Sequence, residues 1–200
     1  MKDPALTPLG VMVLALLRER DMHTYEMARL LRQRRDDRLI SITNGTLYHT
    51  VSRLNEQGLL AEVGTDREGN RPERTTYTLT SAGADAVGDW VRRELGRLDH
   101  PARFRVAVAE AHNLDRAEVI ALLEQRRALV QEDLAHHEEG IASAAERRIP
   151  EQYILEITRQ RMLLQADLDW LDQLLPRLGD PAFAWGADPD HCLAERKAHE

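Results

Sequence analysis

The feature that most constrains this chain is a change of hydrophobic period at Gly58. Before it, apolar side chains recur three and four residues apart, which is the spacing of amphipathic helices. After it come two β-favouring runs, 59–63 and 75–79, which flank a segment with the Gly, Asn and Pro of a hairpin tip. We therefore expect short helices followed by a two-stranded β-ribbon.

The first 98 residues divide into four helices and this ribbon. One helix is expected from about Thr7, which can cap it, with Pro8 in its first turn. A second begins at Thr24, a third lies between a cap at 43–44 and Gly58, and a fourth spans about 80–98. The second helix is expected to bury Tyr25, Met27, Ala28, Leu30 and Leu31. Three helices, a hairpin and an exit helix predict a winged helix-turn-helix domain.

The third helix is the candidate recognition helix for duplex DNA. The major groove admits one helix, whose N-terminal end presents N–H groups and a positive dipole to phosphate. Small hydroxyl and amide side chains crowd this end, and an aromatic ring, a histidine and an arginine follow. Arginines of the ribbon are expected along the DNA backbone or in the minor groove. The expected DNA-binding residues are Ser41, Thr43, Asn44, Thr46, Tyr48, His49, Arg53, Arg67, Arg71 and Arg74.

Each of these assignments has a plainer alternative. Residues 41–46 could serve only as a helix cap, and Tyr48 could belong to the core because it adjoins Leu47. Two aspartates partly offset a cluster of arginines, which suits a solvated helix end as well as phosphate contacts. That cluster, left outside the expected site, consists of Arg29, Arg32, Arg34, Arg35 and Arg38.

Several stretches of this domain resemble a known family. Residues 43–49 (TNGTLYH), 53–60 (RLNEQGLL) and 74–83 (RTTYTLTSAG) are similar to the signature of PadR-family transcriptional regulators. Residues 23–27 match the opening of the family's second helix. Together, these stretches extend the resemblance over residues 6–98. The resemblance implies a DNA-binding regulator, more often a repressor.

Charge is divided unevenly along the chain. Residues 1–100 carry 15 Lys and Arg against 15 Asp and Glu, whereas residues 101–200 carry 12 against 19. An acidic surface repels a polyanion, so we expect only the amino-terminal half to face a phosphate backbone.

The second half is expected to consist of helices. A short helix closes near Asn113, and Asp115 is expected to cap a long helix, with Glu118 in the capping-box position. A last helix spans about 151–178 after a break at Ile149-Pro150. About 28 helical residues span roughly 42 Å, and this apolar stripe is too wide for one neighbour, so a second subunit is the simplest cover. Twofold pairing would set two recognition helices about 34 Å apart on a palindromic operator. The expected dimer interface contains Ile154, Ile157, Leu164, Leu168, Leu171 and Leu175.

The sequence thus predicts a mainly α fold with a winged helix DNA-binding domain at 1–98, a helical dimerisation domain at 99–178 and a flexible tail at 179–200. The second half resembles the helical C-terminal region of the longer PadR regulators, which is related to that of the virulence activator AphA. A small effector between the winged domains and the helical arms would change the spacing of the recognition helices. Trp90 and Trp170 are candidate walls of its pocket, or else ordinary core residues.

Motifs of catalysis, metal binding and membrane insertion are missing from the sequence. It has no Gly-rich phosphate loop or nucleophile elbow, and its single Cys192 makes neither an internal disulfide nor a Cys-rich zinc site. No apolar run reaches the roughly 18 to 20 residues of a membrane helix. We expect a cytoplasmic homodimer that binds double-stranded DNA, is not an enzyme and needs no cofactor or metal. The alternative is a helical adaptor whose winged domain contacts protein.

Overall fold

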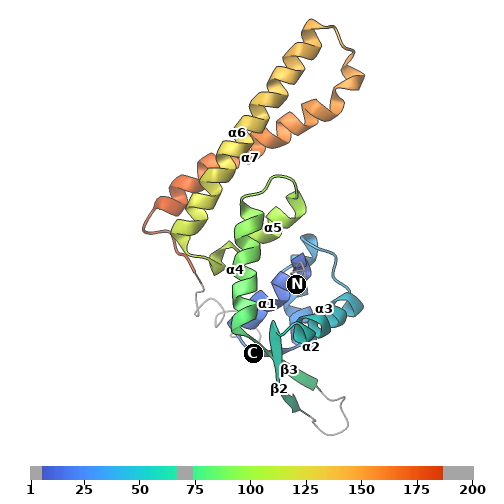
Figure 1. The fold of residues 1–200 in the computed structure, drawn as a ribbon, viewed down its shortest axis with the longest axis vertical. Helices are drawn as coiled ribbons and strands as arrows, with labels where there is room; N and C mark the ends of the chain where they lie inside the picture. Colours follow the sequence, from blue (N-terminus) through green and yellow to red (C-terminus); the bar gives the residue numbers. More distant parts are fainter. Residues whose placement is uncertain (1–5, 67–73, 187–200) are drawn as a thin grey trace. The chain divides into compact units, whose positions relative to one another are not determined.

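A computed structural model describes residues 6–66 and 74–186, and it confirms a mainly helical fold with a small sheet (Figure 1). The described residues divide into two units. The first contains α1 (Pro8–Glu19), β1 (Met22–His23), α2 (Thr24–Gln33), the 3-10 helix η1 (Asp36–Arg38), α3 (Asn44–Glu56), β2 (Leu60–Asp66), β3 (Arg74–Leu79), α4 (Ser81–Leu95) up to residue 94, α5 (Pro101–Ala109) and η2 (Ala111–Asn113). The second contains residues 95–99, α6 (Arg116–Glu146), η3 (Glu151–Tyr153) and α7 (Leu155–Gly179).

Helix α1 forms the centre of the first unit's core. Every residue from Gly10 to Leu17 is buried, and α3, β3 and α5 all contact this helix. The helix begins where the sequence predicted, because the Thr7 hydroxyl accepts a hydrogen bond from the Gly10 N–H at 3.2 Å. The predicted cap and the predicted first turn are therefore confirmed.

The sheet has three antiparallel strands in the order β1-β3-β2. The predicted ribbon is present, with Leu60 opposite Leu79 and an irregularity of register between Glu62 and Gly64. Strand β1 was not predicted, because two residues carry no visible alternation of apolar and polar positions. It pairs with β3 through Met22 opposite Tyr77, which fastens the start of α2 to the ribbon.

Two glycines are required by the turns around the ribbon. Gly58 follows α3 with φ at +69°, a left-handed conformation that glycine adopts without strain. A Cβ on Gly83 would lie 2.0 Å from the Leu59 carbonyl oxygen, so only glycine allows the start of α4 to approach β2 this closely. Helix α4 ends at Leu95, three residues earlier than expected.

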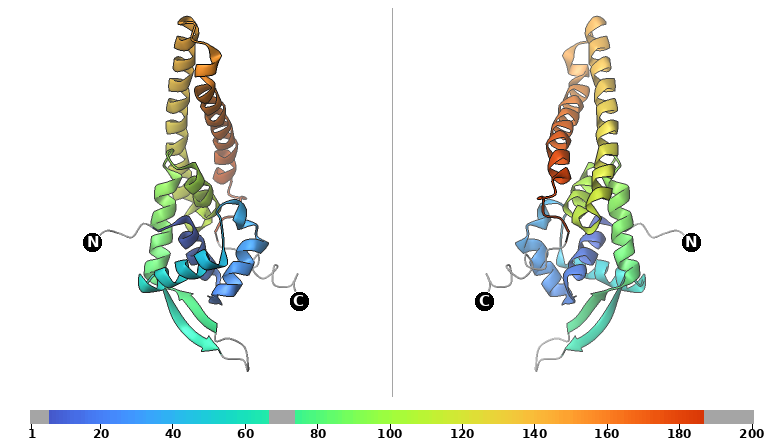
Figure 2. Two further views of the ribbon diagram at one scale, coloured as in Figure 1. Left: turned by 90° about the vertical axis from the view of Figure 1, so that its right-hand side faces the viewer. Right: turned by 90° about the vertical axis from the view of Figure 1, so that its left-hand side faces the viewer.

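The second unit is a helical hairpin in which α6 and α7 run side by side (Figure 2). The buried positions of both helices follow one stripe each, and they are Val119, Leu123, Arg126, Val130 and Leu134 on α6 with Leu164, Leu171 and Leu178 on α7. Arg126 occupies a core position at 3% exposure, where its guanidinium donates to the Arg97 carbonyl and contacts Asp167 at 3.5 Å. Helix α7 begins at Leu155 rather than near 151, and it continues past Pro176.

Helix α5, which follows the expected boundary at 98, lies within the first unit. Of the expected tail, residues 180–186 are described, and there the Trp185 Nε1 donates to the Leu114 carbonyl at 2.9 Å. Cys192 lies outside the described residues. Among the helices of the described part, none has an apolar stretch long enough to cross a membrane.

Candidate nucleic-acid interface

The start of α3 is closed by a reciprocal pair of threonine bonds. The Thr43 hydroxyl accepts from the Thr46 N–H at 3.1 Å, and the Thr46 hydroxyl accepts from the Thr43 N–H at 3.0 Å. The helix cap that the sequence analysis gave as the alternative role of residues 41–46 is thus present. Both threonines, with Ser41 and Asn44, are nevertheless exposed, so capping leaves their outer surfaces accessible.

Helix α3 has one buried and one open face. Leu47, Val51 and Leu54 are buried, as predicted. Tyr48 is 54% exposed, so its alternative assignment to the core is wrong. His49 beside it is exposed too, and so is Ser52 one turn later. Ser52 was missed by the sequence analysis, although its spacing of four and three residues from Tyr48 and His49 places all three on one face.

Arg53 lies at the edge of this face and contacts α1. Its Nη2 donates to the Thr7 hydroxyl at 3.2 Å, and the residue is half-buried. The Nε atom is buried and has no hydrogen-bond partner among the described residues. The side chain therefore joins α3 to the cap of α1, which differs from the free extension toward a phosphate that the sequence suggested.

The outer face of α2 adds side chains that sequence reasoning misplaced or left out. Tyr25 was expected in the core, but it is 64% exposed, because Met27, Ala28 and Leu31 already fill the buried face. Arg29 and Arg32 lie four and seven residues further along the same open face. The Arg32 Nη2 donates to the Asn44 Oδ1 at 2.5 Å, so α2 and the start of α3 form one surface.

The ribbon is described only in part. Arg67 and Arg71 lie outside the described residues, and Arg74 begins β3 with a side chain that is outside the description as well. The beginning of β3 is tied to β1 through His23, whose Nδ1 lies 3.2 Å from both the Thr75 carbonyl and the Thr76 hydroxyl. The predicted DNA contacts of the ribbon arginines remain predictions.

Behind the interface, acidic groups lie where α1, α2, η1 and η2 meet. Burial raises the pKa of Glu110 to about 7, against the opposing hydrogen bond from Asn113. Burial also raises the pKa of Asp36, although Arg34 and Arg38 act in the opposite direction. Arg34 binds Glu19 through two bonds of 2.6 and 2.8 Å, so this arginine of the cluster is engaged within the protein.

The predicted dimer residues fall into two groups. Leu164 and Leu171 are buried within the chain, and Ile154, Ile157, Leu168 and Leu175 are half-buried. Larger apolar surfaces lie on residues that the prediction omitted, namely Tyr153 at 71%, Leu155 at 58%, Met162 at 65% and Leu163 at 46% exposure. The wide apolar stripe that the sequence predicted for the last helix thus separates into a face that contacts α6 and another face that is exposed to solvent.

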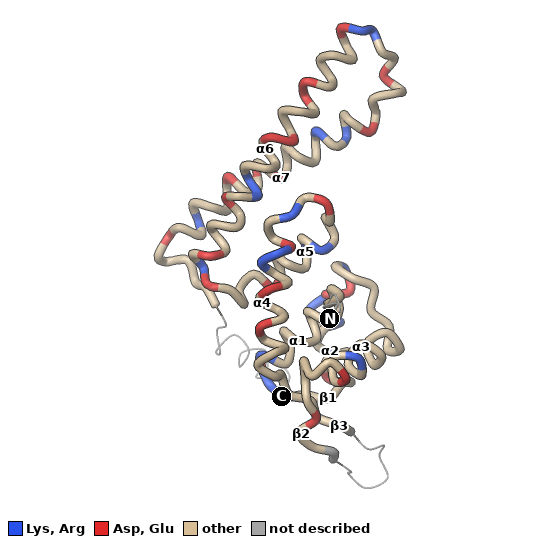
Figure 3. Tube along the Cα trace, viewed as in Figure 1, with Lys and Arg blue, Asp and Glu red and all other residues tan. Residues whose placement is uncertain are grey.

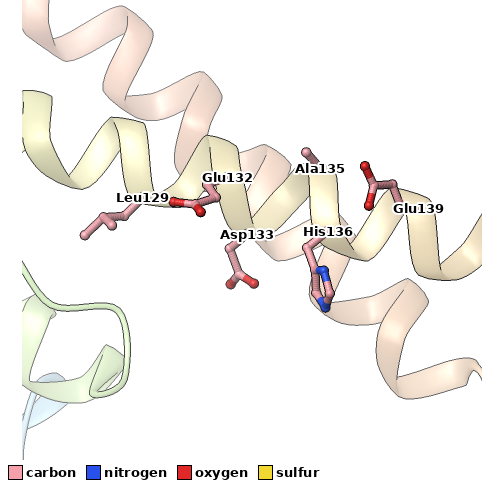
Figure 4. A pocket seen from close by; sticks show the side chains of 6 residues that line it. All are labelled: Leu129, Glu132, Asp133, Ala135, His136 and Glu139. Carbon is pink, nitrogen blue, oxygen red and sulfur yellow. The ribbon is translucent and has the colours of Figure 1, made fainter.

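Figure 4 shows a hollow along one face of α6, lined by Leu129, Glu132, Asp133, Ala135, His136 and Glu139. The candidate pocket walls lie elsewhere, since Trp90 is 1% exposed within α4 and Trp170 is half-buried on α7. Acidic positions outnumber basic ones along both helices of the hairpin (Figure 3). Across the described ranges, no three His, Cys, Asp or Glu side chains are grouped so that they could hold a metal ion.

The first unit matches a known family. Residues 13–89 match the model of the Transcriptional regulator PadR-like family. These residues form a PadR-like domain. The matched range includes α2, α3, the whole sheet and parts of α1 and α4, so the amino-terminal resemblance to PadR-family regulators is confirmed. The family is one of transcriptional regulators, in agreement with the expectation that the chain is not an enzyme.

Several solved structures are similar to the chain. Bacillus subtilis PadR in complex with operator DNA is 18% identical, with 85% of this chain and 98% of that chain covered and a TM-score of 0.41. The same protein in complex with p-coumaric acid is 18% identical over 90% and 99%, at 0.37. The smu.1604c protein of Streptococcus mutans UA159 is 15% identical over 84% and 98%, at 0.39. No curated protein matches the sequence.

Proposed function

We propose that this chain is a homodimeric, DNA-binding transcriptional regulator that inserts α3 into the major groove of a palindromic operator. The observation that carries the proposal is the open polar face of α3 within a PadR-like domain. Tyr48 and His49 are exposed there, beside the capped N-terminus at which backbone N–H groups and the helix dipole favour phosphate. A closed core holds this face in place from behind.

Contacts to the DNA backbone divide among three places in this proposal. Tyr25 and Arg29 on the open face of α2 approach the phosphates beside the groove, since the first helix of such a motif crosses the backbone. The hydroxyls at the start of α3 donate to phosphates or read base edges. Arg67, Arg71 and Arg74 of the ribbon supply sequence-independent affinity, as predicted from the sequence.

A second copy of the chain is proposed to cover the open apolar face of α7. Leu155, Met162 and Leu163 lie there, on a helix whose other face already contacts α6. A twofold pair would place the two α3 helices about 34 Å apart, which is one turn of duplex DNA. The dimer is therefore part of operator recognition.

Regulation completes the proposal. We propose that the chain is a repressor whose affinity for the operator depends on a small effector. The effector binds between the winged domains and the helical arms and alters the spacing of the two α3 helices. Trp170 is the more accessible of the two candidate wall residues, because Trp90 is almost fully buried.

The salt dependence of binding tests this function against the adaptor alternative. Fluorescence anisotropy of labelled duplexes, titrated with the full chain at several salt concentrations, should show affinity that falls steeply with ionic strength. Each neutralised phosphate contributes about 0.9 to the slope of log affinity against log salt. A protein-binding adaptor would show no such DNA binding, and its protein contacts would respond weakly to salt. A flat salt response therefore excludes the proposal.

Two variants separate anchoring from reading. Arg71→Ala should weaken binding to all sequences alike and reduce the salt slope by about 1, whereas Asn44→Ala should narrow the gap between operator and random DNA. Arg147→Ala is the matched control, because it removes the same charge at the C-terminal end of α6, which belongs to the other unit. Equal losses on both DNAs with Asn44→Ala would contradict the assigned roles.

A further inference from the structure

We infer that Arg32 and Asn44 act as one recognition unit that selects a guanine in each half of the operator. This inference rests on the proposed function and names the base that the start of α3 recognises. Asn44 is the first residue of α3, and Arg32 lies in the last turn of α2. Both side chains are exposed, and the Arg32 Nη2 donates to the Asn44 Oδ1.

The chemistry of the guanidinium fixes how the Asn44 amide faces. An arginine carries five N–H donors and no acceptor, so only the carbonyl oxygen of an amide can bond to it. The Nδ2 group of Asn44, which has two N–H donors, is therefore the end turned away from Arg32, and it has no acceptor among the described residues. The accessible groups of the pair are N–H donors.

The positive charge of Arg32 is retained in this arrangement. Arg34, two residues later, is bound to the Glu19 carboxylate at 2.6 and 2.8 Å, whereas Arg32 bonds to a neutral amide and has no carboxylate partner within 6–66 and 74–186. A neutral partner orients the guanidinium without neutralising it. The pair therefore remains an attractive site for groups that accept hydrogen bonds.

A surface of donors distinguishes the bases in the major groove. Guanine presents two acceptors, N7 and O6, whereas adenine presents one acceptor and one donor and cytosine presents a donor. An asparagine reads adenine with both ends of its amide, because its oxygen accepts from N6 and its nitrogen donates to N7. Since Arg32 engages the oxygen of Asn44, the adenine contact is disfavoured, and N7 and O6 of guanine match the remaining donors.

Binding-site selection from duplexes with a randomised half-site tests the inference. The full-length wild type, Asn44→Ala and Arg32→Ala are compared with Arg29→Ala as the control. Arg29 lies on the same open face of α2 as Arg32 but makes no bond to Asn44, so its loss removes the same charge without releasing the amide.

The wild type should enrich guanine at one position of each half-site, and Asn44→Ala should lose about 5- to 150-fold of discrimination there. Arg32→Ala should shift the same position toward adenine, because the amide oxygen is released. Arg29→Ala should weaken binding to every sequence and keep the guanine.

Several outcomes would overturn the inference while leaving the proposed function intact. These are adenine at the Asn44-dependent position in the wild type, no position-specific loss in Asn44→Ala, or an Arg32→Ala variant that behaves like Arg29→Ala. A wild type that enriches no sequence would instead overturn the proposed function itself. Thermal melts of the three variants, all at exposed positions, separate lost binding from unfolding.

Discussion

The two units of this protein bury their apolar residues in different ways. In the first, short elements from many parts of the sequence enclose α1, and the large apolar residues left in the open include two tyrosines on the proposed DNA face, Tyr25 and Tyr48. In the second, two long helices meet along one seam, and aliphatic side chains such as Leu155 and Met162 stay exposed. A core built from many directions closes on itself, whereas two helices cover only one side of each other. The difference supports the proposal that a second copy of the chain covers the second unit, whereas the first unit encloses its own core.

The largest expected effect concerns the closed core of the first unit. Trp90→Ala should lower the free energy of unfolding by about 3–5 kcal/mol, because a buried aromatic side chain leaves a cavity. Urea denaturation of the full chain measures this loss. Trp90→Phe is the control, since it keeps most of the ring and removes a buried Nε1 that has no partner among the described residues. A loss below about 1 kcal/mol for Trp90→Ala would contradict the closed core.

A substitution on the open face of the second unit should weaken dimer formation and leave the stability of the folded chain almost unchanged. Met162→Asp should leave unfolding of the isolated chain within about 0.5 kcal/mol of wild type. It should raise the dimer dissociation constant about 30-fold or more, because a charge would be buried at the contact. Sedimentation equilibrium measures this constant, with Gln125→Asp on α6 as a control of equal charge change. A wild type that sediments as a single chain at all concentrations would remove the proposed partner.

Acidity should affect the first unit through Glu110. Its pKa is near 7 in the folded protein and near the ordinary 4.5 when unfolded, so the folded state holds a proton that the unfolded state releases. The stabilisation from this bound proton is complete below about pH 4.5 and is lost as the pH rises from about 4.5 to 7. Above pH 7 the buried carboxylate is charged, and it lowers the free energy of unfolding by a constant amount. Glu110→Gln should therefore stabilise the protein by about 1–3 kcal/mol at pH 8, and little at pH 4. Denaturation curves across this pH range measure the change, and Glu139→Gln, at an exposed position of α6, is the control. Parallel pH profiles of stability for the wild type and Glu110→Gln would contradict the raised pKa assigned to Glu110.

The smallest expected effect is the loss of stability when the residue before a helix is changed, and it can be compared between the two units. Thr43→Ala should cost about 1 kcal/mol, because the Thr43 hydroxyl caps α3, whereas Thr43→Ser should cost much less. Asp115→Ala before α6 should cost less than Thr43→Ala, since the Asp115 side chain makes no capping bond. Chemical denaturation of the three variants measures the order. An equal cost at both caps would show that the closing bonds of Thr43 contribute little.

Most signals that act within one turn of the chain were predicted correctly, whereas the expected cap of α6 was wrong, because the Asp115 side chain makes no capping bond. Thr7 caps α1, Thr43 caps α3, and Gly58 ends α3 in a left-handed conformation. Each of these depends on hydrogen bonds or dihedral angles between residues at most four apart, so the local sequence is sufficient to specify them. The order of the α-helices and of β2 and β3 followed from the same signals.

Signals that depend on distant residues were not predictable from the sequence pattern. Arg53 contacts Thr7, which lies 46 residues earlier, and β1 exists because it pairs with β3 more than 50 residues later. Tyr25 was placed in the core because it adjoins apolar residues, yet its own position faces outward. The bond between Arg32 and Asn44 joins two helices across a turn that no periodicity describes.

By itself, the sequence determined most of the helices, the strands β2 and β3, the starts of α1, α2 and α3, and that a winged domain precedes a helical one, because these properties arise from neighbours along the chain. Only the tertiary structure decided which side of each helix is open. It left Tyr25 and Tyr48 outside, took Leu164 and Leu171 into the hairpin, and exposed Met162. The physical reason is that a helix can turn any of its faces to solvent at similar local cost, so that the choice depends on side chains brought close by folding.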